Sequence, residues 1–288
     1  MYTEFYGLRE IPFGLTPNLK FLFRTESYLE MLYNIRYGIS QTKGLVVVTG
    51  EAGTGKTTTL RSAIQHPGRD VLTVYIFNPF LTILDFYDQL IRGLGIDAGN
   101  STTKSSILTV LGRLLQNRHA HGLRTALIVD EAHGLSPELL EEIRLLLNYE
   151  TGTEKLLQII LCGQPELQQT LNQPNLRQLK QRISLRCTLR PLSGYEVGKY
   201  IRFRLRTAGA TQVNLFDRAA IETITRLSQG VPRIVNNLCD NALLFGFAGG
   251  QKIITREVIE EVAETLDLPT FSAPPVAVPE AASANKVM

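Results

Sequence analysis

The fold follows from Gly50-Glu51-Ala52-Gly53-Thr54-Gly55-Lys56-Thr57, which matches the phosphate-binding pattern G-x-x-x-x-G-K-[ST]. An apolar, strand-like run at 45–49 precedes it, and a segment compatible with a helix, 58–65, comes after it. Glycines in such a loop let backbone N–H groups turn inward around phosphate oxygens, and the helix N-terminus adds partial positive charge. The pattern therefore predicts a nucleotide site between a strand and a helix.

The side chains of this loop have separate chemical roles. Lys56 is expected to neutralise the β- and γ-phosphates, and the Thr57 hydroxyl is expected to bind Mg²⁺. We therefore expect ATP and Mg²⁺ as cofactors. The candidate nucleotide-binding residues are Gly50, Glu51, Ala52, Gly53, Thr54, Gly55, Lys56, Thr57 and Thr58.

Two adjacent carboxylates end a second apolar run, 125–129. In a parallel sheet, ligands bind beyond the carboxyl ends of the strands, which places Asp130 and Glu131 beside the phosphate loop. Asp130 is the candidate second residue for Mg²⁺, and Glu131 is the candidate that polarises the attacking water. Acids at a strand end are often only solvated, but a phosphate loop upstream favours the catalytic interpretation.

Two further polar residues are candidates for contacts with the γ-phosphate. Gln164 follows the buried run 156–162 and is expected to touch that phosphate or to orient water, with a simple turn residue as the alternative. Arg233 lies in the first turn of a predicted helix, where its charge opposes the helix dipole. A bound nucleotide would supply the missing anion, and a surface salt bridge is the alternative.

Basic residues are concentrated between 177 and 206. A solvated face is the usual meaning of such a run, and contact with nucleic-acid phosphates is another. Arg182 stands just before the fifth predicted strand, where its guanidinium could reach the γ-phosphate bound by a neighbouring subunit. The segment holds one acid, Glu196, and nine bases: Arg177, Lys180, Arg182, Arg186, Arg190, Lys199, Arg202, Arg204 and Arg206.

The wider pattern is an α/β fold with a parallel sheet and helices on both faces, followed by a helical region. Short apolar runs at 45–49, 71–77, 125–130, 157–162 and 186–189 predict about five strands. Helices are expected at 27–41, 193–209, 215–229, 232–247 and 255–266, with Ser27 and Asn214 among the N-caps. The expected divisions are an N-terminal strap (1–26), a sheet domain (27–191), a small all-helical lid domain (192–268) and a disordered tail (269–288).

Composition excludes several classes of protein. The 288 residues are 44% hydrophobic and 20% charged, which is typical of a globular protein. A net charge of +3 is too small to require nucleic acid or an anionic membrane as partner. The three cysteines are far apart, which favours a reducing compartment. No signal peptide or membrane span is expected, and we therefore predict a cytoplasmic protein.

These residues together resemble an AAA+ ATPase, and the short motifs narrow the resemblance to the general secretion pathway protein A (ExeA) family. The resemblance covers about residues 1–268. It rests on Tyr2-x-x-Phe5-Tyr6-Gly7-Leu8-x-x-x-Pro12-Phe13-x-Leu15-x-Pro17, on Val129-Asp130-Glu131-Ala132-His133, on Gly163-Gln164-Pro165-Glu166-Leu167 and on Gly230-x-Pro232-Arg233-x-x-Asn236. The resemblance to AAA+ ATPases implies that Gln164 is the candidate for sensor one, Arg182 the arginine finger and Arg233 sensor two.

The resemblance implies an ATPase that drives assembly of an envelope machine, as a nucleotide-dependent oligomer that forms a ring. Full-length relatives carry a membrane span and a peptidoglycan-binding domain, and this sequence contains neither. We expect a short form that serves a secretion, envelope or exopolysaccharide system through an envelope or membrane-associated protein, peripherally at the inner membrane. Two alternatives are an ATP-dependent DNA-binding protein of the transposition-helper kind, which the charge does not favour, and a nucleotide-gated scaffold with little hydrolysis.

Overall fold

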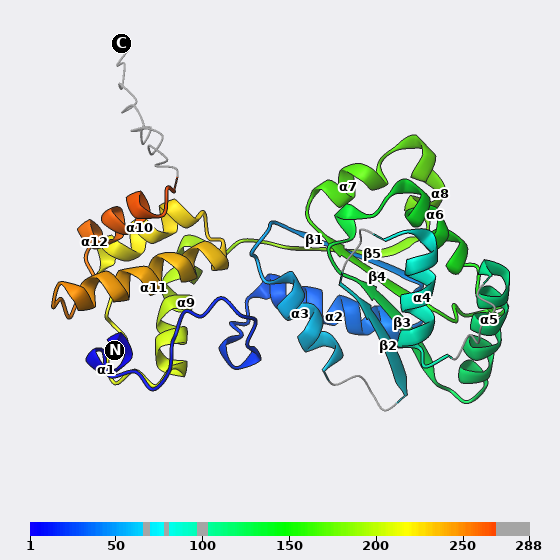
Figure 1. Ribbon diagram of the computed structural model, residues 1–288, viewed down its shortest axis with the longest axis horizontal. Coiled ribbons are helices and arrows are strands. Elements are labelled where there is room, and N and C mark those ends of the chain that lie inside the picture. Colours follow the sequence, from blue (N-terminus) through cyan, green and yellow to red (C-terminus); the bar gives the residue numbers. More distant parts are fainter. Residues whose placement is uncertain (66–69, 78–80, 97–102, 269–288) are drawn as a thin grey trace, which may run out of the picture.

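The computed structural model describes residues 1–65, 70–77, 81–96 and 103–268. This part of the chain forms a sheet covered by helices and, beside it, a group of C-terminal helices (Figure 1). The tail predicted over 269–288 lies outside the described residues.

The sheet has five parallel strands in the order β2-β3-β4-β1-β5, which confirms the predicted fold class. Because all strands run the same way, the residues that follow β1, β3 and β4 lie together at the carboxyl ends of the strands. The strands are β1 (Leu45–Gly50), β2 (Val71–Ile76), β3 (Arg124–Val129), β4 (Gln158–Gly163) and β5 (Ile183–Leu189).

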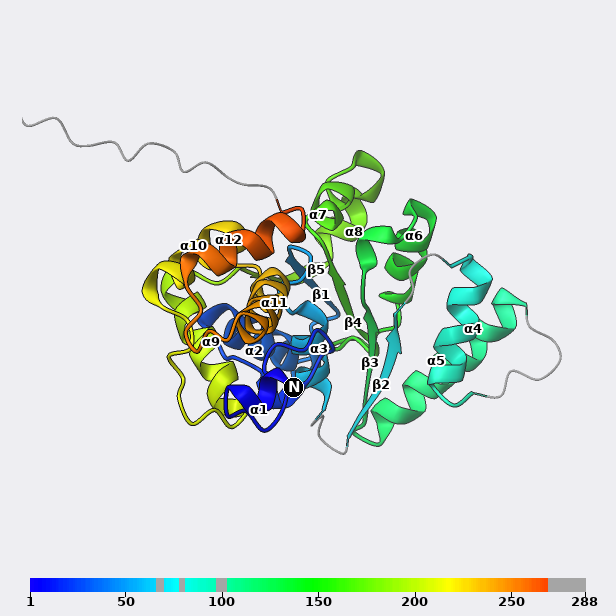
Figure 2. The ribbon, with the colours of Figure 1, turned by 60° about the vertical axis from the view of Figure 1, so that its left-hand side comes forward.

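Both faces of the sheet are buried, which explains why the central strands are continuously apolar. Along β1, Leu45 and Val47 join the core on one face, and Val46 and Val48 join the core on the other. Figure 2 shows the helices on both sides of the sheet. The first face is covered by α4 (Ile83–Gly93), α5 (Lys104–Ala120), α6 (Pro137–Leu146), α7 (Glu166–Leu171) and α8 (Arg177–Gln181), and the second by α2 (Glu26–Ser40) and α3 (Lys56–Ile64).

The C-terminal helices form a separate core together with the start of the chain. Phe13 and Phe21, from the N-terminal strap, are buried in it. The strap is not wholly extended, since it contains α1 (Tyr2–Phe5) and a short 3-10 helix, η1 (Leu19–Phe21). The C-terminal helices are α9 (Gly194–Thr207), α10 (Arg218–Ser228), α11 (Pro232–Ala248) and α12 (Arg256–Thr265).

Two predicted N-caps are wrong. The α2 cap is Thr25, whose hydroxyl accepts the N–H of Tyr28 at 3.2 Å, so Ser27 lies inside the first turn. Helix α10 begins after Asp217 rather than Asn214, because Phe216 first forms a β-bridge with Ile254.

Gly230 has a close backbone contact at the junction between the sheet and the C-terminal helices. Its φ is +75°, and a Cβ atom there would lie 1.9 Å from the carbonyl oxygen of Leu192. Gly230→Ala is therefore expected to lower the free energy of unfolding by about 2 kcal/mol or more, because left-handed backbone and a displaced Leu192 both cost energy. Thermal denaturation measures this. Gly152→Ala is the control, since Gly152 has no described atom within 4 Å of its Cβ position. Equal melting of both variants and the parent would contradict the expectation.

Candidate active site

The phosphate loop connects β1 to α3 with two glycines in left-handed backbone. Gly53 has φ +79° and Gly55, the N-cap of α3, has φ +102°. No described atom lies within 4 Å of the Cβ position of Gly55, so the loop is open there to a ligand. The buried ammonium of Lys56 donates to the carbonyl oxygens of Gly50 and Glu51 at 2.7 and 3.0 Å. The loop therefore has the geometry that holds phosphate.

Asp130 is buried at the end of β3 and accepts three hydrogen bonds. Its Oδ2 accepts from the hydroxyls of Thr57 and Tyr75, each at 2.7 Å. Its Oδ1 accepts the backbone N–H of Glu131 at 3.0 Å. A hydroxyl and a carboxylate this close are oxygen ligands suited to Mg²⁺, which takes few protein ligands and completes its shell with water and phosphate oxygens.

Glu131 is held in an unusual backbone conformation, with φ +53°. Its Oε2 atom is buried and has no hydrogen-bond partner among the residues that the structure describes. Nδ1 of His133 lies 3.4 Å from this oxygen. Such strain and an unsatisfied carboxylate oxygen are features of functional sites, where a ligand supplies the missing partner.

Gln164 follows β4 and contacts His133. The backbone N–H of Gln164 donates to His133 Nδ1 at 3.4 Å, and its amide nitrogen lies 3.2 Å from Nε2. Through His133, the residue that follows β4 is therefore connected to Glu131, which follows β3.

A cavity of about 440 Å³ lies next to these residues. The phosphate loop, Glu131 and Gln164 line it from the sheet, and Arg233 lines it from α11. The backbone N–H of Arg233 donates to the Gly53 carbonyl at 3.3 Å. Arg233 has no ion pair within the described part of the chain, so its charge is available to an anion in the cavity. Residues of the N-terminal strap between Gly14 and Phe23 also line the cavity.

Comparison with known proteins agrees with this arrangement. Residues 39–171 match the family described as AAA domain. The general secretion pathway protein A of Aeromonas hydrophila is 43% identical over 259 residues, which are 90% of this chain and 47% of that protein. The resemblance to that protein is therefore confirmed, and residues 39–171 are similar to an AAA domain. The chain spans about half the length of this curated relative.

Solved structures support the same fold at low identity. Cdc6p from Pyrobaculum aerophilum superposes with a TM-score of 0.68 and 17% identity, over 90% of this chain and 71% of that one. The Drosophila ORC bound to DNA gives 0.62 and 19%, over 85% and 61%. The Thermotoga maritima RuvB branch migration motor gives 0.53 and 17%, over 84% and 70%. At these identities the similarity shows the AAA+ fold alone.

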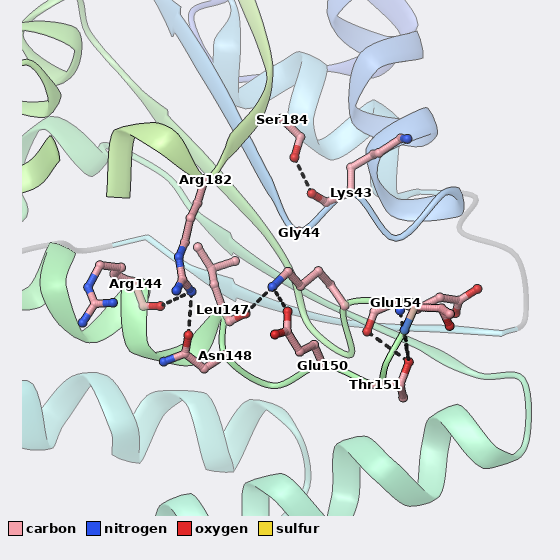
Figure 3. Close-up of polar contacts among 12 residues, drawn as sticks. Lys43, Gly44, Arg144, Leu147, Asn148, Glu150, Thr151, Glu154, Arg182 and Ser184 are labelled. Atoms are coloured by element: carbon pink, nitrogen blue, oxygen red, sulfur yellow. Dashed lines mark hydrogen bonds and ion pairs between the residues drawn. The ribbon is translucent and has the colours of Figure 1, made fainter. Parts of the chain in front are cut away.

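Arg182 lies apart from the cavity, whereas the other predicted site residues line it or, like Asp130, contact a residue that lines it. It precedes β5, so it lies at the end of the sheet opposite the phosphate loop. Its guanidinium donates to the carbonyl oxygen of Arg144 at 3.2 Å and to the side-chain oxygen of Asn148 at 2.7 Å (Figure 3). Arg182 therefore cannot reach the phosphate loop of its own chain.

The basic segment 177–206 does not form one face. Arg182 and Arg190 lie beyond opposite ends of β5. Arg204 is buried: its Nε donates to the Pro12 carbonyl at 2.6 Å, and its guanidinium carbon lies 4.9 Å from the centre of the Phe21 ring. Arg204 thus joins the strap to α9, and it is not available to a partner's phosphates. No helix in the described part of the chain is both long and apolar enough to cross a membrane.

Sequence reasoning missed three parts of the site. Tyr75 reaches Asp130, His133 joins Glu131 to Gln164, and the strap lines the cavity. A polar residue near the end of an apolar strand was the signal for Tyr75. The aromatic and proline content of the strap indicated packing, but it did not indicate which surface.

Proposed function

We propose that this chain binds ATP with Mg²⁺ and hydrolyses it to ADP and phosphate. The supporting observation is the single cavity lined by the phosphate loop, Glu131, Gln164 and Arg233. Phosphoryl transfer to water needs a loop that holds phosphate, a group that orients water, and cations that stabilise the developing negative charge.

The phosphate loop performs binding. Backbone N–H groups around Gly53 and Gly55 hold the phosphate oxygens, and Lys56 turns its ammonium from the loop carbonyls toward the β- and γ-phosphates. Thr57 and Asp130 would hold Mg²⁺, which supplies charge neutralisation at the phosphates when bound.

Glu131 acts on the attacking water. Its unpaired Oε2 accepts a hydrogen bond from water at the γ-phosphate and draws electron density onto the water oxygen. Gln164 orients that water or the phosphate, and it contacts His133, which lies 3.4 Å from Glu131.

Two arginines complete the proposed site from different subunits. We propose that the C-terminal helices form a lid spanning 192–268. Arg233, which belongs to this lid, contacts the phosphates. Arg182 reaches the γ-phosphate bound by a neighbouring subunit, since its own cavity lies at the other end of the sheet. Activity then requires a nucleotide-dependent oligomer, which we propose is a ring.

The similarity to the general secretion pathway protein A supports a role in powering or regulating assembly of a bacterial secretion, envelope or exopolysaccharide system. We propose that the chain acts in the cytoplasm and reaches the inner membrane through an envelope or membrane-associated protein partner. DNA binding and a nucleotide-gated scaffold remain the alternative predictions, and the second would bind ATP while releasing little phosphate.

Replacing Lys56 tests nucleotide binding. Lys56→Ala is expected to weaken binding of a fluorescent ATP analogue by roughly 10- to 100-fold, because hydrogen bonds to charged groups contribute about 1.5–3 kcal/mol. Fluorescence anisotropy measures the affinity, and phosphate release measures turnover.

Lys199→Ala is the control, because Lys199 is an exposed lysine of α9 that does not line the cavity. It is expected to bind like the parent. Parental affinity in Lys56→Ala, with the fold intact by thermal denaturation, would refute the proposed phosphate site.

A further inference from the structure

Tyr75 contacts the carboxylate that we propose as a metal ligand, although it belongs to a different strand. Tyr75 pairs with Ile128 in the β2–β3 register, so it lies on the same face of the sheet as Asp130, two residues farther on. Its hydroxyl donates to Asp130 Oδ2 at 2.7 Å. Thr57, from α3 on that face, donates to the same oxygen.

The surroundings of Tyr75 keep this hydrogen bond in place. Its ring packs against Phe77, with 4.3 Å between ring centres, and against the core under α2 and α3. In this hydrogen bond the Tyr75 hydroxyl is the donor, because a carboxylate oxygen accepts.

With these bonds, both oxygens of Asp130 have fixed partners. Oδ1 accepts the Glu131 N–H, and Oδ2 accepts from Thr57 and Tyr75. A carboxylate that is oriented by hydrogen bonds before the metal arrives loses less freedom on binding it, and removing such a partner typically weakens metal binding 10- to 100-fold.

We propose that Tyr75 is a positioning residue of the Mg²⁺ site, which holds the Asp130 carboxylate in the orientation that binds the metal with its nucleotide. This inference rests on the proposed function. It assigns to β2 a part in the site that the phosphate loop and the Asp130-Glu131 pair do not supply.

The test is direct measurement of metal binding in the full chain. Mn²⁺ stands in for Mg²⁺ and is detected by electron paramagnetic resonance in the presence of a non-hydrolysable ATP analogue. Tyr75→Phe keeps the ring and removes the hydroxyl, and it is expected to raise the Mn²⁺ dissociation constant about tenfold. Affinity for the analogue without metal is expected to stay at the parental value, which a general loss of structure would not allow.

Two further variants of the chain test whether the hydrogen bond to Asp130 is responsible for the change in Mn²⁺ affinity. Tyr149→Phe is the control, because the Tyr149 hydroxyl donates to the Leu108 carbonyl, outside the cavity. Replacing Tyr75 with 4-aminophenylalanine restores a donor at the same place and is expected to recover Mn²⁺ affinity.

The outcomes separate this inference from the function on which it rests. Parental Mn²⁺ affinity in Tyr75→Phe, or no recovery with 4-aminophenylalanine, overturns the inference and leaves the proposed function standing. If the parent binds the analogue but no Mn²⁺, the proposed metal site and this inference are both wrong.

Discussion

Glu131→Gln is expected to bind ATP like the parent and to hydrolyse it about 10²- to 10⁴-fold more slowly, the range expected for loss of a general base. The amide keeps the shape of the side chain but cannot draw a proton from water. Because Oε2 has no hydrogen-bond partner among the described residues, the substitution breaks no hydrogen bond there and changes only the 3.4 Å approach of this side chain to His133. Binding should therefore survive, and the variant should hold ATP.

Anisotropy with a fluorescent ATP analogue and single-turnover phosphate release measure the two properties separately. Glu264→Gln is the matched control, since Glu264 is exposed on α12, and it should hydrolyse like the parent. Normal turnover in Glu131→Gln would remove Glu131 from the proposed role.

Arg182→Ala is expected to lower ATP hydrolysis by a factor of about 10³ or more, because an arginine supplied by a neighbour stabilises transition-state charge. The arginine also contacts Arg144 and Asn148 in its own chain, so a structural effect must be separated from a catalytic one. Mixing variants separates them. Lys56→Ala retains Arg182, and Arg182→Ala retains the phosphate loop.

Interfaces that pair an intact loop with an intact Arg182 should recover hydrolysis that neither variant has alone. The control is Arg206→Ala, which removes an exposed charge from α9 and should leave the rate unchanged. Two results would exclude Arg182 as the residue that acts on a neighbour's nucleotide: parental hydrolysis by Arg182→Ala, or no recovery on mixing variants that still oligomerise.

The sheet was predictable because its central strands are buried on both faces and are therefore apolar throughout. Strand β5 was predicted too short, as 186–189, since at the edge of the sheet its exposed Ser184 interrupts the apolar pattern. The phosphate loop and the Asp130-Glu131 pair were predictable from local sequence, because each motif fits its flanking strand.

The contacts between strands were not predictable from local sequence. Tyr75 and Asp130 are 55 positions apart, and they meet only because β2 lies next to β3. The same holds for His133 and Gln164, which the neighbouring strands β3 and β4 bring together. Sequence patterns indicate the burial of each strand, but the order of the strands in the sheet decides which side chains meet at their carboxyl ends.

The packing of the N-terminal strap makes the helical region discontinuous in the sequence. Tyr2 donates to Asp240, the Tyr6 hydroxyl donates to the Gln251 carbonyl, and the Phe13 ring packs edge-on against Phe216. Topologically, the sheet is an insertion between the first and last segments of one helical body. A fragment cut at 192–268 would therefore lose part of its own core and leave an aromatic-binding surface bare.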